Sequence, residues 1–157
     1  MISNTGWKAT DRRRSRIFVA GSKSYLSKFP ATSPFTDYAP VIRYAEVLLN
    51  LAEARVRSTS TVDAQAIALL NAVRGRSDAS TVFSAADFAD ANALADAILL
   101  ERRIEFLGEG LAGADNTRLG RPLPAKPGVA AVPSTAKQYI WPIPATELLL
   151  NNLAVDN

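Results

Sequence analysis

The sequence predicts a mainly α fold, with a tetratricopeptide-like helical hairpin plus further helices, a small β-hairpin and long irregular loops. Apolar residues recur at helical spacing over residues 41–57, 62–75 and about 92–108. Two short β-prone runs lie on either side of Gly21, and prolines gather over residues 30–40 and 122–144. The length of 157 residues and the 48% hydrophobic content fit one globular domain.

Residues 1–39 are expected to form a hairpin and a loop. The runs Ile17–Val19 and Tyr25–Leu26 are joined by Ala20-Gly21-Ser22-Lys23, in which glycine supplies the positive φ that tight hairpin turns require. The loop follows because three prolines exclude regular structure between residues 30 and 40.

Residues 40–76 are expected to form the helical hairpin. Apolar side chains surround most of the helix predicted over 41–57, which indicates burial on several sides. Its polar residues follow one stripe at 3–4 spacing: Arg43, Glu46, Asn50, Glu53 and Arg57. Ser60–Asp63 matches a capping box and Gly75 is a plausible helix stop. One such hairpin cannot bury both of its faces, so we expect it to stack on neighbouring helices.

The remaining segments are helices over 84–110, then a loop and C-terminal strap over 111–157. Ser84–Asp87 is a second capping box, ahead of the longer helix at about 92–108. Four prolines between 122 and 133 indicate an irregular connection, Tyr139–Trp141 resembles an edge strand, and a short helix is expected at about 145–151. Trp141, bounded by Pro142, is expected to be a core residue rather than a sugar platform. Trp7, Tyr25 and Tyr38 lie in loop-like contexts, where stacking on a ligand is easier to picture.

The composition excludes several classes of chemistry. Cysteine and histidine are absent, so disulfides, Ser-His-Asp triads and sites built on thiolate or imidazole ligands are impossible. We predict no metal, no cofactor and no catalytic residue. No apolar run is long enough to span a membrane, and the first residues lack the pattern of a signal peptide.

The charge is distributed unevenly. Residues 1–30 carry seven Lys or Arg side chains against Asp11 alone, whereas residues 31–157 carry eleven positive and fourteen negative side chains. Such an arm could bind nucleic acid or phosphate. The interpretation that we favour is a segment that pairs with acidic groups elsewhere or is solvated, with no nucleic-acid partner.

Glu101 and Glu105 are one helical turn apart, a spacing that raises the alternative of glycoside hydrolysis. Two acids on one helix face provide no cleft between them, and neighbouring arginines would lower the pKa of a general acid. We therefore predict that these carboxylates form a structural lattice of salt bridges with the polar stripe of residues 41–57, and that the chain is not an enzyme.

Two stretches resemble the C-terminal part of SusD/RagB proteins. The first is PVIRYAEVLLNLAEA at 40–54 with AIALLNAVRGR at 66–76, and the second is ERRIEFLGEG at 101–110 with Asp115, Arg118-Leu119-Gly120 and WPIP at 141–144. The residues of this structural motif are Arg43, Glu46, Asn50, Glu53, Glu101, Arg102, Glu105, Glu109, Asp115 and Trp141. Residues 111–114 and Asn151-Asn152 depart from the family pattern, and the first of these departures falls on the contact that normally pins the loop before Asp115.

The resemblance implies a function for the whole protein. SusD/RagB proteins are surface lipoproteins of the outer membrane that deliver glycans or peptides to a TonB-dependent transporter. The resemblance also implies that residues 1–157 are one part of a longer protein, whose lipid anchor and most ligand contacts lie outside this segment. We assign no carbohydrate-binding residue from the sequence. A tetratricopeptide-type protein–protein adaptor without glycan binding remains the alternative.

Overall fold

The computed structural model describes residues 2–151 and 153–155, and the chain divides into two compact units, residues 1–110 and 111–157. The first unit contains a 3-10 helix η1 (Arg12–Arg16), strands β1 (Ile17–Ala20) and β2 (Lys23–Leu26), helices α1 (Tyr44–Thr59), α2 (Ala64–Ser77) and α3 (Ala91–Glu105), and a short 3-10 helix η2 (Ala85–Asp87). The mainly α prediction with a small β-hairpin is confirmed.

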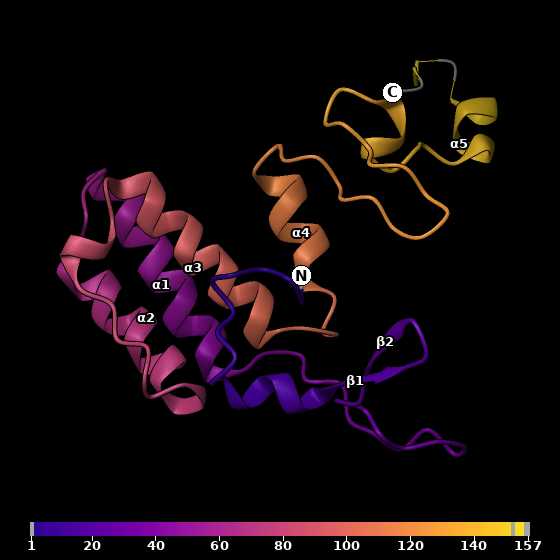
Figure 1. The fold of residues 1–157 in the computed structure, drawn as a ribbon. Coiled ribbons are helices and arrows are strands. Elements are labelled where there is room, and N and C mark those ends of the chain that lie inside the picture. The colour runs from indigo at the N-terminus through magenta and orange to yellow at the C-terminus, as the bar shows by residue number, and fades with distance from the viewer. Residues whose placement is uncertain (1, 152, 156–157) are drawn as a thin grey trace. The chain divides into compact units, whose positions relative to one another are not determined.

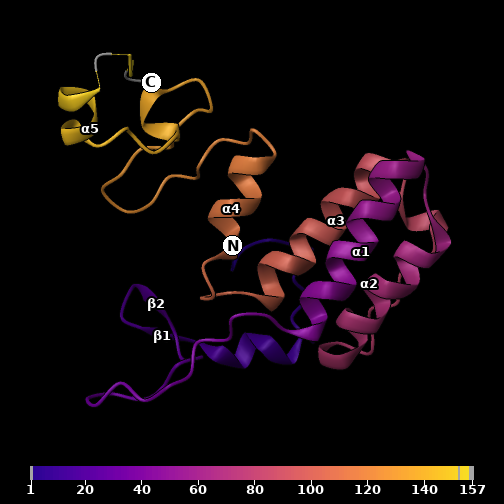
Figure 2. The same cartoon turned by 180° about the vertical axis from the view of Figure 1, so that it is seen from behind.

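The three long helices lie side by side in the first unit. The short connection between α1 and α2 makes them an antiparallel pair, and α3 packs against both (Figures 1 and 2). The core lies where they meet, and it combines small and large apolar side chains that are fully buried: Leu49, Ala52, Ala66, Leu70, Leu94 and Ile98. Small residues on α1 and α2 allow the helices to approach closely, while the leucines and isoleucines supply most of the buried apolar area.

Helix α1 starts later and is less buried than the sequence predicts. Arg43 has extended backbone angles at the N-cap, and Val41 and Ile42 precede the helix with 94% and 68% exposure. Within the helix Val47 and Leu51 are each 46% exposed. Within the described residues α2 and α3 cover one face of α1 only, so the expected burial on several sides is not reached within this part of the protein.

The link between α1 and α2 corrects the predicted capping box. Ser60 adopts a positive φ of 54° and closes α1, so it cannot also start the next helix. Asp63 is the N-cap of α2 instead: its carboxylate accepts a hydrogen bond of 2.7 Å from the backbone of Ala66 and pairs with Arg55. These bonds lower the pKa of Asp63 to about 2, the bond from Arg55 being the largest cause.

The end of α2 also differs from the prediction, whereas the second capping box is confirmed. Helix α2 continues through Gly75 to Ser77, and the backbone N–H of Asp78 donates to Arg74 to close it. Gly75 does not end the helix because its φ is not positive. At η2 the backbone N–H of Ser84 donates to Asp87 at 2.7 Å, as a capping box requires.

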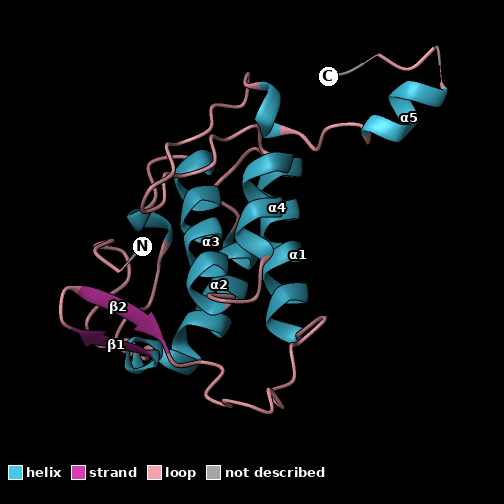
Figure 3. Ribbon diagram, turned by 90° about the vertical axis from the view of Figure 1, so that its right-hand side faces the viewer, coloured by secondary structure: helices cyan, strands magenta, loops and turns pink. Residues whose placement is uncertain are grey.

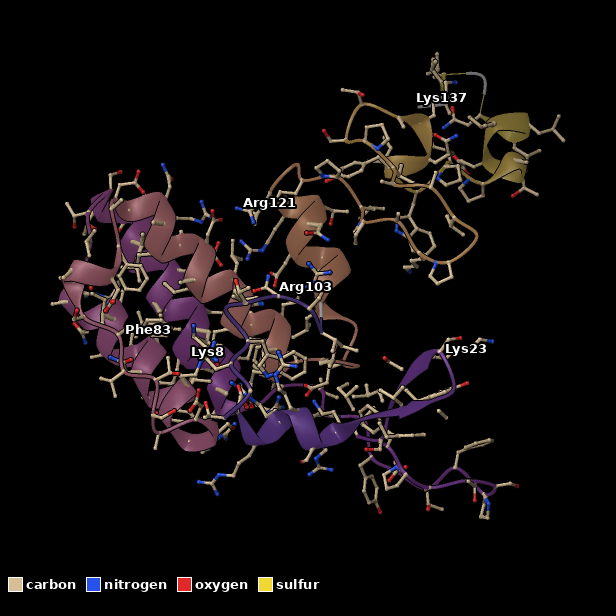
Figure 4. The ribbon with its side chains drawn as sticks, in the orientation of Figure 1. Lys8, Lys23, Phe83, Arg103, Arg121 and Lys137 are labelled. Carbon is tan, nitrogen blue, oxygen red and sulfur yellow. The ribbon has the colours of Figure 1, made fainter. Side chains whose placement is uncertain are left out.

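The predicted β-hairpin around Gly21 is confirmed, with strands that extend further toward the turn than expected. Ala20 pairs with Lys23, and Gly21 supplies the positive φ of 62°. Figure 3 shows the hairpin, and Figure 4 labels Lys23 beside its turn. The rings of Phe18 and Tyr25 stack across the strands with centroids 5.3 Å apart. This stacked cross-strand pair supports the register of an isolated two-stranded sheet.

The second unit contains α4 (Leu111–Arg118), a 3-10 turn η3 (Lys137–Tyr139) and α5 (Ala145–Leu150). The predicted loop over residues 111–118 is wrong, because the prolines start only at Pro122 and an ion pair of 2.8 Å between Asp115 and Arg118 supports the helix. Bonds within α4 also include those from Thr117 to backbone oxygens one turn back.

The expected strand over Tyr139–Trp141 is also absent from the described residues. Tyr139 ends the 3-10 turn, and its buried hydroxyl lies 2.9 Å from the carbonyl oxygen of Arg121. Trp141 is 93% exposed within this structure, which contradicts its expected place in a core. The neighbouring Pro142 and Pro144 explain the extended backbone. No helix in the described part of the chain combines the length and the apolar character needed to span a bilayer.

We predict that two leucines on different faces of α1 differ sharply in their contribution to stability. Leu49→Ala removes a fully buried side chain and should lower the free energy of unfolding by about 2–5 kcal/mol. Leu51→Ala, on the 46% exposed side, is the matched control and should cost less than about 1 kcal/mol. Urea unfolding of both variants measures the difference, and equal losses would contradict the assignment of the buried face.

Candidate functional site

A cluster of charged side chains lies at the C-terminal end of α3, and we call it the charge cluster. Its three glutamates come from α3 and the turn that follows, and Asp11 is the N-cap of η1. Its cations come from η1, the segment after β2, the start of α1 and the last turn of α2. The members are Asp11, Arg13, Lys28, Arg43, Arg74, Arg76, Glu101, Glu105 and Glu109.

Glu101 is the deepest member of the charge cluster, with no exposed surface. Its two oxygens face different arginines: Oε1 accepts a hydrogen bond of 2.7 Å from Arg13 Nη1, and Oε2 lies 2.7 Å from Arg74 Nε. Burial raises the pKa of Glu101, and the charge of Arg13 opposes that rise only in part. The ion pairs are therefore needed to offset the cost of placing this carboxylate in the core.

Asp11 joins the N-terminal segment to the same arginines. It accepts hydrogen bonds of 2.9 Å from the backbone N–H of Arg13 and 2.7 Å from Arg13 Nη2, and it lies 3.4 Å from Arg74 Nη1. Burial acts to raise the pKa of Asp11, but the bonds from Arg13 outweigh it and hold the pKa below its usual value. Asp11 thus remains ionised and fixes the position of Arg13 against α3.

The carboxylate of Glu105 accepts hydrogen bonds from three arginines. Arg13 Nη1 donates to one oxygen at 2.8 Å, and Arg43 Nη1 donates to the other at 2.7 Å, where Arg76 also donates. Burial would raise the pKa of Glu105, but the hydrogen bonds from Arg43, Arg13 and Arg76 lower it. One carboxylate therefore holds together η1, the start of α1 and the end of α2.

Glu109 closes the charge cluster on its outer side. The guanidinium of Arg43 donates two hydrogen bonds to its carboxylate, from Nη2 to one oxygen at 2.7 Å and from Nε to the other at 3.1 Å. Lys28 also donates to Glu109. Such bidentate pairs between arginine and a carboxylate are among the strongest hydrogen-bonded ion pairs.

Three arginines in or near the charge cluster lie over aromatic rings. The guanidinium of Arg43 lies 4.9 Å from the centre of the Phe106 ring, and that of Arg14 lies 4.8 Å from the Trp7 ring. Arg74 lies 5.9 Å from Phe83, which Figure 4 labels beside α2. Cation–π contacts of this kind restrict the arginines without neutralising them. Trp7 itself lies in a loop, as expected, but it is buried and so is not available for stacking on a ligand.

The structure brings together only some of the predicted motif residues. Arg43, Glu101, Glu105 and Glu109 meet in the charge cluster. Others of α1 lie apart from it: Glu53 pairs with Arg57 on the same helix.

Three further motif residues have separate surroundings. Asn50 accepts from Arg102. Glu46 forms no side-chain ion pair with the described residues. Asp115, in the second unit, pairs with Arg118 as described above.

The predicted lattice with the polar stripe of residues 41–57 forms for Glu105, which pairs with Arg43, but not for Glu101. Glu101 pairs with Arg13 and Arg74, neither of which belongs to the stripe. Five members of the charge cluster were missed: Asp11, Arg13, Lys28, Arg74 and Arg76. One signal pointed to two of them, Arg13 and Lys28, because positive charges of residues 1–30 pair with acidic groups on and after α3, as the favoured interpretation proposed.

A pocket of about 470 Å³ opens beside the charge cluster. Its walls come from β2 and the segment after it, from the start of α1 and from the ends of α2 and α3. Gly108 has a φ of +83° and lies so close to Leu26 of β2 that a Cβ there would stand 2.5 Å from the leucine. This glycine lets the hairpin end pack against the turn after α3, which forms one wall of the pocket.

The chemistry available at this site is that of ion pairing and hydrogen bonding. Glu101 and Glu105 are the carboxylates expected by the glycosidase alternative, yet both are buried and held by arginines. Among the residues that the structure describes, no group of three or more His, Cys, Asp or Glu side chains is arranged to hold a metal ion. The arrangement fits a structural clamp with a cation-lined pocket at its edge.

Comparison with known proteins identifies the family. Residues 16–123 match the sequence model of the SusD family, a span that includes the β-hairpin, α1, α2, α3 and α4. The chain belongs to the SusD family. A comparison with curated proteins gave no match.

Two solved SusD superfamily structures are similar to the chain. One, from Bacteroides fragilis, has 36% sequence identity and a TM-score of 0.74, and the match covers 94% of this chain and 34% of that one. The other, from Bacteroides vulgatus ATCC 8482, has 24% identity and a TM-score of 0.75 over 94% of this chain and 35% of that one, and supports the fold alone. The chain thus spans about a third of the length of these SusD superfamily structures.

We predict that the buried carboxylate is essential for stability in this SusD-family chain. Glu101→Ala removes one of the two carboxylates that Arg13 and Arg74 share, and should lower the free energy of unfolding by about 3–5 kcal/mol. The control is Arg103→Ala, which changes an exposed charge on the same helix and should shift stability by less than about 0.5 kcal/mol. Denaturant unfolding gives both values, and a loss below about 0.5 kcal/mol for Glu101→Ala would mean that the pairing is incidental.

Proposed function

We propose that this chain is a non-catalytic part of a cell-surface glycan-binding protein that delivers oligosaccharides to a TonB-dependent outer-membrane transporter. The observation that carries the proposal is membership of the SusD family, through a match over residues 16–123. The whole protein would be a lipoprotein at the outer membrane, with its lipid anchor outside residues 1–157. The similarity over 94% of this chain to the Bacteroides fragilis protein agrees with that assignment.

The geometry of the carboxylates supports a binding role rather than hydrolysis. A general acid must reach the proton acceptor on its substrate within hydrogen-bonding distance. Glu101 has no exposed surface and Glu105 is shared by three arginines, so neither offers a free carboxyl group to a sugar ring. The two glutamates instead hold the N-terminal segment against the helices.

The adaptor alternative rests on the α1–α2 hairpin, whose exposed apolar side chains include Val47 and Leu51. A helical hairpin of this kind occurs in many protein–protein adaptors. The family match favours the glycan-binding function, because it extends beyond the hairpin to the β-strands on one side and α4 on the other.

We predict that the complete gene product, tagged and purified in mild detergent from the organism that encodes it, carries a TonB-dependent barrel in near-equal amount. The same preparation should bind at least one oligosaccharide saturably and release no reducing ends from it. Quantitative mass spectrometry, calorimetry and a reducing-sugar assay measure the three properties.

The control is the same purification from a strain that lacks the gene of the co-purified barrel, in which glycan binding should persist without the barrel. A purified protein that carries no barrel and binds none of starch, levan, xylan and mucin oligosaccharides would contradict the proposal. Steady release of reducing ends that depends on this protein would show an enzyme instead.

A further inference from the structure

The pocket beside the charge cluster has more positive than negative side chains in its lining. Five cationic side chains face three acidic ones, which gives the lining a formal charge of +2. The cations are Arg13, Arg16, Lys28, Arg43 and Arg76, and the acids are Asp37, Glu105 and Glu109. An excess of positive charge in a concave site attracts anions more strongly than the same charge on a flat surface.

The lining arginines differ in how much of their hydrogen-bonding capacity is already used. The guanidinium of Arg13 is bound to Asp11, Glu101 and Glu105. That of Arg43 is likewise bound at all three nitrogens, to Glu105 and Glu109. These two arginines belong to the charge cluster and have little left for a ligand.

Arg16 and Arg76 retain free donors. Arg76 donates to Glu105 through Nη2 only, and its side chain is 59% exposed. The guanidinium of Arg16 forms no hydrogen bond or ion pair with any residue that the structure describes, and the residue is exposed. The pocket therefore offers two guanidinium groups whose geometry suits a bidentate anion.

The remaining walls suit the faces of a sugar ring. Phe29 and Tyr38 line the pocket together with Leu26, Pro40, Ile104 and Leu107, and Tyr38 is 96% exposed. Aromatic and apolar walls with a few polar groups are typical of small-ligand sites, and a volume of about 470 Å³ lies in their usual range.

From these observations we propose that the pocket binds an acidic sugar unit, with its anionic group held by Arg16 and Arg76 and its ring against Tyr38 and Phe29. The inference rests on the proposed glycan-binding function and names a substrate class for it. It also departs from the sequence-based expectation that ligand contacts lie largely outside this segment. The anionic group is a carboxylate, as in a uronic acid, or a sulfate ester, since both present the same acceptor oxygens to arginine.

The test uses the 157-residue chain and three ligands that differ at one carbon: cellobiose, its uronic acid counterpart and its 6-O-sulfate. Calorimetry should detect saturable binding of the acidic forms that weakens as salt is added, and at least tenfold weaker binding of cellobiose. The two acidic ligands distinguish a carboxylate site from a sulfate site.

Variants should move the affinity in opposite directions. Arg16→Ala and Arg76→Ala should each weaken binding of the acidic ligand about tenfold, since a hydrogen bond to a charged group is lost. Asp37→Asn removes the one lining acid that has no ion pair among the described residues, and should strengthen binding. Arg103→Ala, an exposed arginine of α3 outside the pocket lining, is the matched control and should change nothing (Figure 4).

Three results would overturn the inference. They are no binding of either acidic ligand by the folded chain, equal binding of cellobiose, or full affinity in the Arg16→Ala, Arg76→Ala double variant. Circular dichroism and unfolding of each variant check that the chain is folded. If the complete gene product still binds neutral oligosaccharides, the acidic pocket alone is refuted and the proposed function stands.

Discussion

Four carboxylates with almost no exposed side-chain surface lie at the end of α3, and each needs positively charged partners there. The arrangement of the first unit supplies these partners. Asp11, Glu101, Glu105 and Glu109 come from two distant parts of the chain. Five cations surround them, one from the segment of Asp11 and four from three further segments. A buried carboxylate that lost its partners would cost several kcal/mol. The ion pairs therefore help to hold the segments that supply the cations against α3.

The pocket depends on that arrangement. Arg13 and Lys28 fix η1 and the segment after β2 against the end of α3, while Arg43 fixes the first turn of α1. These segments then become the pocket walls, with Arg16 three residues beyond Arg13 on the rim. In this account the charge cluster has a positioning role: its own donors are used within the chain, and they leave the neighbouring donors of Arg16 and Arg76 in place for a ligand.

Much of the fold was predictable because it depends on local sequence. The periodicity of residues 92–108, the turn at Gly21 and the capping box at Ser84 each gave the observed element. The misplaced start of α2 arose because Ser60 and Asp63 both suit an N-cap, and tertiary pairing of Asp63 with Arg55 decides between them. Helix α4 was missed because Gly113 and the prolines from Pro122 onward made the composition of this segment resemble a loop. The i,i+3 ion pair between Asp115 and Arg118 that supports the helix was not taken into account.

The candidate site was less accessible to sequence reasoning. Arg13 meets Glu101 and Glu105 across 88 and 92 residues, and no spacing rule joins such distant positions. The charge imbalance suggested an arm that pairs with acidic groups or is solvated, and it named no partner. A double-mutant cycle of Arg13→Ala and Glu101→Ala tests most directly whether the cluster holds the unit together. We expect a coupling of about 1.5–3 kcal/mol in the free energy of unfolding, whereas additive effects within about 0.5 kcal/mol would contradict the account.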